Sequence, residues 1–200
     1  TMSLPTTYLV LLVLSWGLTG LLRYYALKKN ILDVPNQRSS HTLPTPRGGG
    51  VAFVVCFLGM LFLLARKGEI EATTFQVILI TSLIVALLGF YDDCYHLSAK
   101  TRLLGHFIAA SLLVYWISGV EQWLPSSNYV LIMFVHFALV VYLVWFINLF
   151  NFMDGIDGLA AIETVTICFG GALLYVLDGQ FQFIKFPLSL ACPVAGFLLW

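Results

Sequence analysis

Seven long apolar segments leave this chain few ways to fold. A helix needs about 20 consecutive apolar residues to cross the ~30 Å hydrocarbon layer of a bilayer. Lipid offers the backbone no hydrogen-bond partners, so spanning segments form helices or closed barrels, and these runs are too long and uniformly apolar for barrel strands. The predicted spans lie at 6–27, 48–66, 73–91, 103–120, 128–150, 159–177 and 183–200.

The composition agrees with an all-α polytopic membrane protein. Hydrophobic residues make up 60% of the chain and charged residues 10%, against roughly 25% charged in soluble domains. The formal net charge is zero, which argues against a nucleic-acid partner and leaves the lipid bilayer as the expected environment. We predict a single membrane domain, 1–200. Because Trp200 lies inside an apolar segment, we expect this domain to be the N-terminal part of a longer protein.

Basic residues predict the orientation of the spans. Lys and Arg favour the cytoplasmic side of a membrane. They concentrate in the loops after the first and third spans, at Lys28, Lys29, Arg38, Arg47, Lys100 and Arg102. The N-terminus is therefore predicted outside, and the ends of the third and fifth spans on the cytoplasmic face.

Carboxylates and amides gather at those two span ends. The third span closes on Asp92 and Asp93, and the fifth runs into Asn148–Gly158, which has polar side chains at 148, 151, 154 and 157. A membrane boundary retains such groups when partners, a substrate or a metal compensates them. Oxygen ligands of this kind suit Mg²⁺ or Mn²⁺, which bridge to substrate phosphates. We therefore predict one polar site at the cytoplasmic face.

Each cluster also has a plainer interpretation. A straight helix would not gather side chains at 148, 151, 154 and 157, because each step of three drifts by about 60°. A helix that ends near Gly155 would let them converge. Otherwise the two amides bond neighbouring helices and the acids face water. Asp92 and Asp93 form either a metal-binding or proton-accepting pair, or a solvated loop balanced by Lys100 and Arg102.

A glycine run precedes the second span. Arg47 followed by Gly48–Gly50 would offer a cation and unobstructed backbone N–H groups to an anion near a helix start. A flexible hinge is the alternative. His41 lies in the same polar loop. Zinc at Cys94 and His96 is disfavoured, because no second pair of ligands has the required spacing.

Three segments taken in order resemble one enzyme family. Pro44–Gly50, Gly89–Asp93 and Asn148–Gly158 resemble motifs of the polyprenyl-phosphate sugar-1-phosphate transferases. This bacterial family, glycosyltransferase family 4, includes phospho-MurNAc-pentapeptide translocase and enzymes that initiate O-antigen, common-antigen and teichoic-acid linkage synthesis. The resemblance covers essentially the whole chain, and the third motif is the most specific.

The resemblance implies transfer of a sugar-1-phosphate, of the N-acetylhexosamine type, from a UDP-sugar to undecaprenyl phosphate, with Mg²⁺ and release of UMP. This would be an initiating step of cell-envelope polysaccharide synthesis at the cytoplasmic face of the bacterial inner membrane. The resemblance also implies a role for each of nine residues. These roles are catalysis by Asp92 and Asp93, metal binding by Asn151, nucleotide-sugar binding by Asp154, Gly155, Ile156 and Asp157, and phosphate binding by His41 and Arg47.

The sequence departs from the family at two places. His96 stands where some relatives carry a third aspartate, which weakens a metal cluster of three carboxylates. The family's later aspartate motif, its main metal ligand, and its basic, His-containing cytoplasmic loop would fall after Trp200. The resemblance therefore implies little or no transferase activity for residues 1–200 alone, and it leaves the donor sugar and a homodimer undecided.

Two other classes compete with an enzyme. A secondary transporter or channel would use membrane acids to relay protons or coordinate ions, and those acids should lie near mid-membrane. Here the acids lie at span ends, which favours chemistry at the interface. A catalytically inactive scaffold derived from the enzyme family is the third possibility, and the intact carboxylates argue against it.

Overall fold

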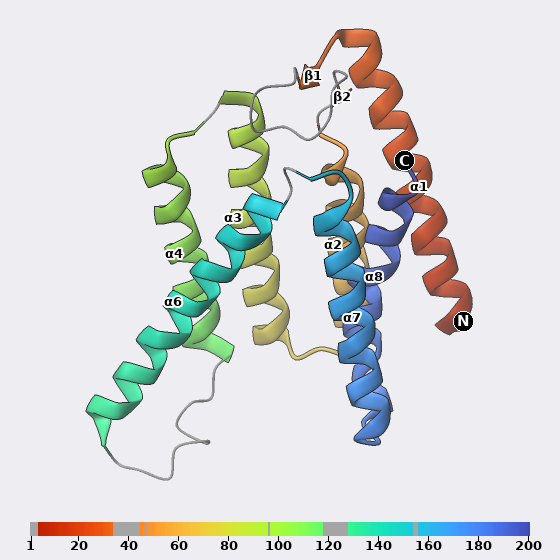
Figure 1. Cartoon of the computed structure of the whole chain (residues 1–200). Coiled ribbons are helices and arrows are strands. Elements are labelled where there is room, and N and C mark those ends of the chain that lie inside the picture. The colour runs from red at the N-terminus through yellow and green to blue at the C-terminus, as the bar shows by residue number, and fades with distance from the viewer. Residues whose placement is uncertain (1–3, 34–44, 47, 96, 118–127, 154–155) are drawn as a thin grey trace. The chain divides into compact units, whose positions relative to one another are not determined.

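The chain is almost entirely helical (Figure 1). The computed structural model describes residues 4–33, 45–46, 48–95, 97–117, 128–153 and 156–200. The chain divides into two compact units, and each is described by itself. The first comprises 1–63 with 153–200, and the second comprises 64–152.

The first unit is built around helix α8. Long helices α1 (Leu4–Lys29) and α7 (Leu159–Leu177) both pack against α8 (Lys185–Leu198). A short 3₁₀ helix, η1 (Phe181–Phe183), joins α7 to α8. Helix α2 (Gly50–Arg66) adds an aromatic contact at its start, where the rings of Phe53 and Phe197 lie 5.6 Å apart.

Small side chains allow α1 and α8 to approach closely. Gly196 faces the backbone of α1, where a Cβ atom would collide with the carbonyl oxygen of Leu12. One turn away, the buried Ser15 hydroxyl donates to the carbonyl oxygen of Pro193 over 2.6 Å. At the end of α8, the Trp200 indole Nε1 donates to the carbonyl oxygen of Trp16 over 2.8 Å. The contact therefore combines close backbone packing with hydrogen bonds at two levels.

The second unit contains α3 (Ala72–Tyr95), α4 (Ala99–Ile117) and α6 (Tyr129–Met153). Helices α3 and α4 form an antiparallel pair joined by a short connection. Gly105 of α4 lies directly against Leu88 of α3, where a Cβ atom would overlap the Leu88 methyl group. This close approach lies one turn from Asp92, so it sets the spacing of the two helices near the predicted site.

Two short strands precede α2 in the chain, and the second of them contacts α1. Strands β1 (Leu32–Asp33) and β2 (Thr45–Pro46) pair antiparallel, with Leu32 opposite Pro46. They lie near the two ends of the polar loop between the first two predicted spans, 6–27 and 48–66. The all-helical class is unaffected by a pair of this size.

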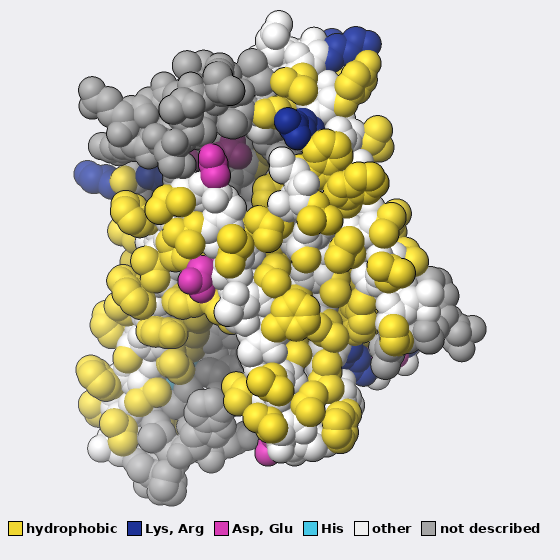
Figure 2. All heavy atoms as spheres, turned by 45° about the vertical axis from the view of Figure 1, so that its right-hand side comes forward, with side chains coloured by type: hydrophobic (Ala, Val, Ile, Leu, Met, Phe, Trp, Pro, Cys, Tyr) yellow, Lys and Arg dark blue, Asp and Glu magenta, His cyan; other side chains and the backbone are white. Residues whose placement is uncertain are grey.

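The surface is that of a membrane protein. Figure 2 shows hydrophobic side chains over most of the visible face, and large apolar residues such as Leu9, Phe62 and Phe137 are more than half exposed. Exposed apolar area on this scale marks a surface that lipid or another chain covers. Five helices of the described part are long and apolar enough to span a membrane: Pro5–Lys29, Ala72–Tyr95, Tyr129–Met153, Leu159–Leu177 and Phe181–Leu198.

The predicted all-α membrane class is confirmed, and each predicted span overlaps a helix of the described part. Helix α2 is shorter than the five spanning helices, at 17 residues. Helix α4 is not among the five, because Lys100, Arg102 and His106 lower its mean hydropathy. The boundaries differ most for the third and fourth spans. Helix α3 continues to Tyr95 rather than residue 91, and α4 begins at Ala99 rather than residue 103.

The α1–α8 contact can be tested with a single methyl group. Gly196→Ala is expected to lower the free energy of unfolding by about 1–3 kcal/mol, because the new Cβ atom meets rigid backbone rather than a side chain that can rotate away. Denaturant unfolding in detergent micelles measures this loss. Gly17→Ala on α1 is the matched control, since no atom lies within 4 Å of the added Cβ. An equal loss in both variants would contradict the packing described.

Candidate functional site

Asp92 and Asp93 lie on the last turn of α3, not in a loop beyond it. Asp92 is half-buried, while Asp93 is exposed. Nη1 of Arg102 donates to Oδ2 of Asp92 over 2.8 Å, with exposed side-chain fractions of 31% for the arginine and 20% for the aspartate. The interpretation as a solvated loop is therefore wrong for Asp92, although its expected partner Arg102 is the correct one.

From the sequence, Arg102 is expected only to balance the charge of the acids and not to be part of the site. In the structure its guanidinium contacts Asp92 directly. A half-buried carboxylate without a cation would bear a large desolvation cost. Lys100 is exposed. Among the described residues, Arg102 is thus the cation that lies against the Asp92 carboxylate.

Below this ion pair lies a histidine. His106 follows Arg102 by four residues on α4, so the two side chains share one face of the helix. His106 is only 6% exposed, and its Nδ1 has no hydrogen-bond partner among the described residues.

The motif Asn148–Gly158 contains a helix end, as predicted. Helix α6 ends at Met153, and α7 begins at Leu159 after Gly158, whose φ of 74° lies in the left-handed region. The Asn148 amide nitrogen donates to the carbonyl oxygen of Val144 on its own helix over 2.8 Å. Asn151 is exposed on the last turn of α6.

The remaining residues of this motif lie partly outside the described structure. Ile156 and Asp157 are exposed in the connection before α7 and belong to the first unit, whereas Asp92 and Asn151 belong to the second. Asp154 and Gly155 lie outside the described residues. Their assembly with Asp92 into a single site stays a prediction.

The glycine run opens α2, as predicted. Gly48 has a φ of 85°, and Gly49 packs so closely on the Phe197 ring that a Cβ atom would lie 2.9 Å from it. Both glycines therefore have a structural role. Gly48 adopts a left-handed backbone conformation, and Gly49 allows close packing against the Phe197 ring. His41 and Arg47 lie outside the described residues, so phosphate binding by them stays a prediction.

The described residues do not make a metal centre by themselves. No group of three or more His, Cys, Asp or Glu side chains suited to a metal ion occurs among them. Asn151 offers an exposed amide oxygen, a ligand type that Mg²⁺ accepts. A single such ligand does not hold the ion, so Mg²⁺ stays a prediction from the resemblance.

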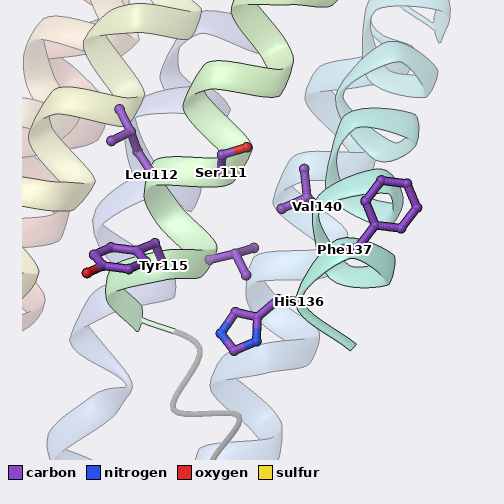
Figure 3. Close-up of a pocket in the computed structure, with 7 residues that line it drawn as sticks. Ser111, Leu112, Tyr115, His136, Phe137 and Val140 are labelled. Carbon is purple, nitrogen blue, oxygen red and sulfur yellow. The ribbon is translucent and has the colours of Figure 1, made fainter. Parts of the chain in front are cut away.

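An apolar groove of about 420 Å³ lies between α4 and α6, away from the acids (Figure 3). Its lining includes Ser111, Tyr115, His136 and Val140. Unlike His106, His136 has its Nδ1 within 2.9 Å of a carbonyl oxygen of its own helix, that of Ile132. No carboxylate and no basic side chain of Lys or Arg occurs among the described residues that line the groove, so it is not the predicted polar site.

Comparison with known sequences identifies similar proteins. The family model described as "Glycosyl transferase family 4" matches residues 74–200. The chain is 29% identical to a decaprenyl-phosphate N-acetylglucosaminephosphotransferase of Mycobacterium leprae, over 92% of the chain and 50% of the relative. It is 27% identical to a probable undecaprenyl-phosphate N-acetylglucosaminyl 1-phosphate transferase of Bacillus subtilis, over 92% and 51%.

A third relative belongs to a different enzyme type. The chain is 31% identical to a phospho-N-acetylmuramoyl-pentapeptide-transferase of Lactiplantibacillus plantarum, over 78% of the chain and 53% of the relative. The chain thus spans about half the length of the curated relatives it matches.

The helix spacing beneath the ion pair is testable by a double-mutant cycle. Gly105→Ala is expected to lower the free energy of unfolding by about 1–3 kcal/mol, because the added methyl group displaces Leu88. In a Leu88→Ala background most of that loss should disappear, since the obstructing atoms are gone. Unfolding in detergent micelles measures both. Equal losses in the two backgrounds would show that the Leu88 contact does not set the α3–α4 spacing.

Proposed function

The chain belongs to glycosyl transferase family 4, and on that premise we propose that it transfers a sugar-1-phosphate from a UDP-sugar to undecaprenyl phosphate. The relatives include transferases that are named for a polyprenyl phosphate and for the transfer of N-acetylglucosamine phosphate. The proposed donor is a UDP-N-acetylhexosamine. The proposed setting is the inner membrane of a bacterium, where the product would start a cell-envelope polysaccharide such as an O-antigen or a cell-wall polymer.

The observation that carries this proposal is the Asp92–Arg102 ion pair. It places a half-buried carboxylate and a partly exposed guanidinium 2.8 Å apart, at the end of a membrane-spanning helix. A lipid-linked phosphate is confined to that depth, because its tail stays in the bilayer and its head stays at the interface. Arginine binds phosphate through several N–H donors. The pair thus combines an anion-binding cation with a carboxylate that can orient or deprotonate the acceptor.

The proposed reaction is a phosphoryl substitution. A phosphate oxygen of undecaprenyl phosphate attacks the sugar-bearing phosphorus of the UDP-sugar. The bond from that phosphorus to the bridging oxygen breaks, and UMP leaves with the bridging oxygen. Asp92 would orient the attacking phosphate or accept a proton from it, with Asp93 in support. Positioning and charge stabilisation supply most of the catalysis in such transfers.

The other assignments stay proposals with their own basis. Asn151, Asp154, Gly155, Ile156 and Asp157 match the family's third motif, which implies metal and nucleotide-sugar binding. His41 and Arg47 would contact phosphate. Mg²⁺, or Mn²⁺ in its place, would screen the charge between the two substrates' phosphates when bound.

A secondary transporter is the second candidate, and the depth of the acids argues against it. Asp92 and Asp93 lie within one turn of the end of α3, and Asp157 lies outside any helix. A transporter's coupling acids are expected near mid-membrane, in broken helices. The position of these carboxylates suits a reaction between a membrane lipid and a water-soluble nucleotide.

The activity can be tested by following UMP. The full-length protein, incubated with undecaprenyl phosphate, Mg²⁺ and a panel of UDP-sugars, is expected to release UMP from a UDP-N-acetylhexosamine. Asp92→Asn and Asn151→Ala should each lower the rate at least 100-fold, because they remove the proposed acceptor carboxylate and the proposed metal ligand. Asp178→Asn is the matched control, since Asp178 lies at the far end of α7. Release of UMP at the normal rate by Asp92→Asn would refute the assigned role.

The orientation can be tested with a native cysteine. Cys94 is exposed beside Asp93, while Cys56 and Cys168 are buried. A membrane-impermeant maleimide should therefore label Cys94 in inside-out vesicles and not in right-side-out vesicles. Cys94→Ser should abolish that labelling. Labelling in right-side-out vesicles alone would place the acids outside and contradict a cytoplasmic active face.

A further inference from the structure

The indole ring of Trp200 is fixed on the surface of α1. It lies so close to Gly20 that an added Cβ atom would be 2.6 Å from Cζ2 of the ring. It stacks on Trp16, with ring centroids 5.8 Å apart and ring planes at 19°, and its Nε1 donates to the carbonyl oxygen of Trp16 over 2.8 Å. Trp200 is nevertheless 50% exposed. The ring is therefore held in one orientation at the surface of the first unit, beside α1 (Figure 1).

Arg23 lies over this ring. Its guanidinium carbon is 5.3 Å from the centroid of the Trp200 ring, a distance at which a cation is attracted to the aromatic face. Trp16, Gly20 and Arg23 follow one another at intervals of four and three residues, so they share one face of α1. Arg23 is itself exposed. Trp200 thus holds an exposed guanidinium at a defined position on α1.

The second half of α1 is positively charged. Lys28 and Lys29 lie in its last turn, and the helix contains no Asp or Glu. The helix dipole favours cations in the last turn, which accounts for the two lysines. Arg23 lies six residues before Lys29, or about 9 Å along the axis, beyond the range of that effect. An arginine exposed on a membrane-spanning helix needs an anionic partner.

Exposed apolar side chains continue this face toward the middle of α1. Val13 is 52% exposed and Leu9, one turn further, is 61% exposed. Val13 and Arg23 lie ten residues apart in α1, about 15 Å at the rise of an α-helix. This distance is about half of the ~30 Å hydrocarbon layer. The face thus offers apolar contacts over the depth of one leaflet and a guanidinium at its boundary.

We propose that this face of α1 binds an anionic phospholipid of the cytoplasmic leaflet, with its phosphate at Arg23 and an acyl chain along Trp16 and Val13. A phosphodiester offers oxygen acceptors that match guanidinium N–H donors. A zwitterionic headgroup has the same phosphate, but its own ammonium cancels the charge that the cations of α1 attract. The site does not depend on the proposed function, because α1 and Trp200 belong to the first unit and the Asp92–Arg102 ion pair to the second.

The first test compares two lipids on the full-length protein. Thermal unfolding in detergent micelles, titrated with phosphatidylglycerol or phosphatidylcholine, gives an apparent affinity for each, because a ligand of the folded state raises Tm by mass action. Phosphatidylglycerol is expected to bind more tightly. Arg23→Gln should weaken its binding at least fivefold, since one basic residue near anionic lipid contributes about 1 kcal/mol. Arg66→Gln is the matched control, an exposed cation at the end of α2, and should stay within twofold.

The second test separates a built site from diffuse attraction of charge. Arg23→Lys keeps the charge without the planar donors, and Trp200→Leu removes the ring beneath the guanidinium. Each should weaken phosphatidylglycerol binding at least threefold. Because both lipids are measured on each variant, a loss of intrinsic stability affects the two titrations alike. Binding to Arg23→Lys as tight as to the wild type would overturn the proposal, as would equal affinities of the wild type for the two lipids.

Two further measurements distinguish other occupants of this face. Glycerol phosphate has the headgroup without the chains and is expected to leave Tm unchanged, so stabilisation equal to that by phosphatidylglycerol would indicate a site for free phosphate. Light scattering on the purified protein tests for a second copy. A dimer that Arg23→Gln dissociates, together with no response to phosphatidylglycerol, would assign the face to the second copy and overturn the lipid site.

Discussion

A charge beside the hydrocarbon layer needs a partner, and in this chain the Asp92–Arg102 ion pair supplies it. The pair spans 2.8 Å between the end of α3 and the start of α4. It depends on the close approach of Gly105 to Leu88, one turn deeper. Removing either charge would leave the other half-buried and unpaired, which is costly in a medium of low dielectric constant. The packing of α3 against α4 and the geometry of the ion pair therefore depend on each other in this unit.

The helices were predictable from the sequence because length and hydropathy are properties of each segment by itself. The predicted break near Gly155 is also confirmed at the end of α6, at Met153. The errors at the ends of α3 and α4 share one cause. Backbone hydrogen bonding carries a helix beyond its apolar run, so Asp92, Asp93 and Arg102 lie on helices and not in the predicted loop.

The contacts of the site were less predictable, because they depend on how each helix is rotated. The polar residues of α3 and α4 do not gather on one side of either helix, so no polar stripe in their sequences shows which face meets a neighbour. The pairing of Arg102 with Asp92 is apparent only once the helices are packed together. A useful signal was present in the spacing of Arg102, Gly105 and His106, which places a cation, a small residue and an imidazole within five residues of one helix.

The choice of arginine at 102 has a physical reason in the proposed reaction. The acceptor phosphate would bring a second anion toward the Asp92 carboxylate, and the two would repel each other without a cation between them. A guanidinium has five N–H donors in a fixed plane, and only Nη1 is engaged with Asp92. The remaining donors leave room for the phosphate without breaking the ion pair. A lysine ammonium would offer a point charge without that planar geometry.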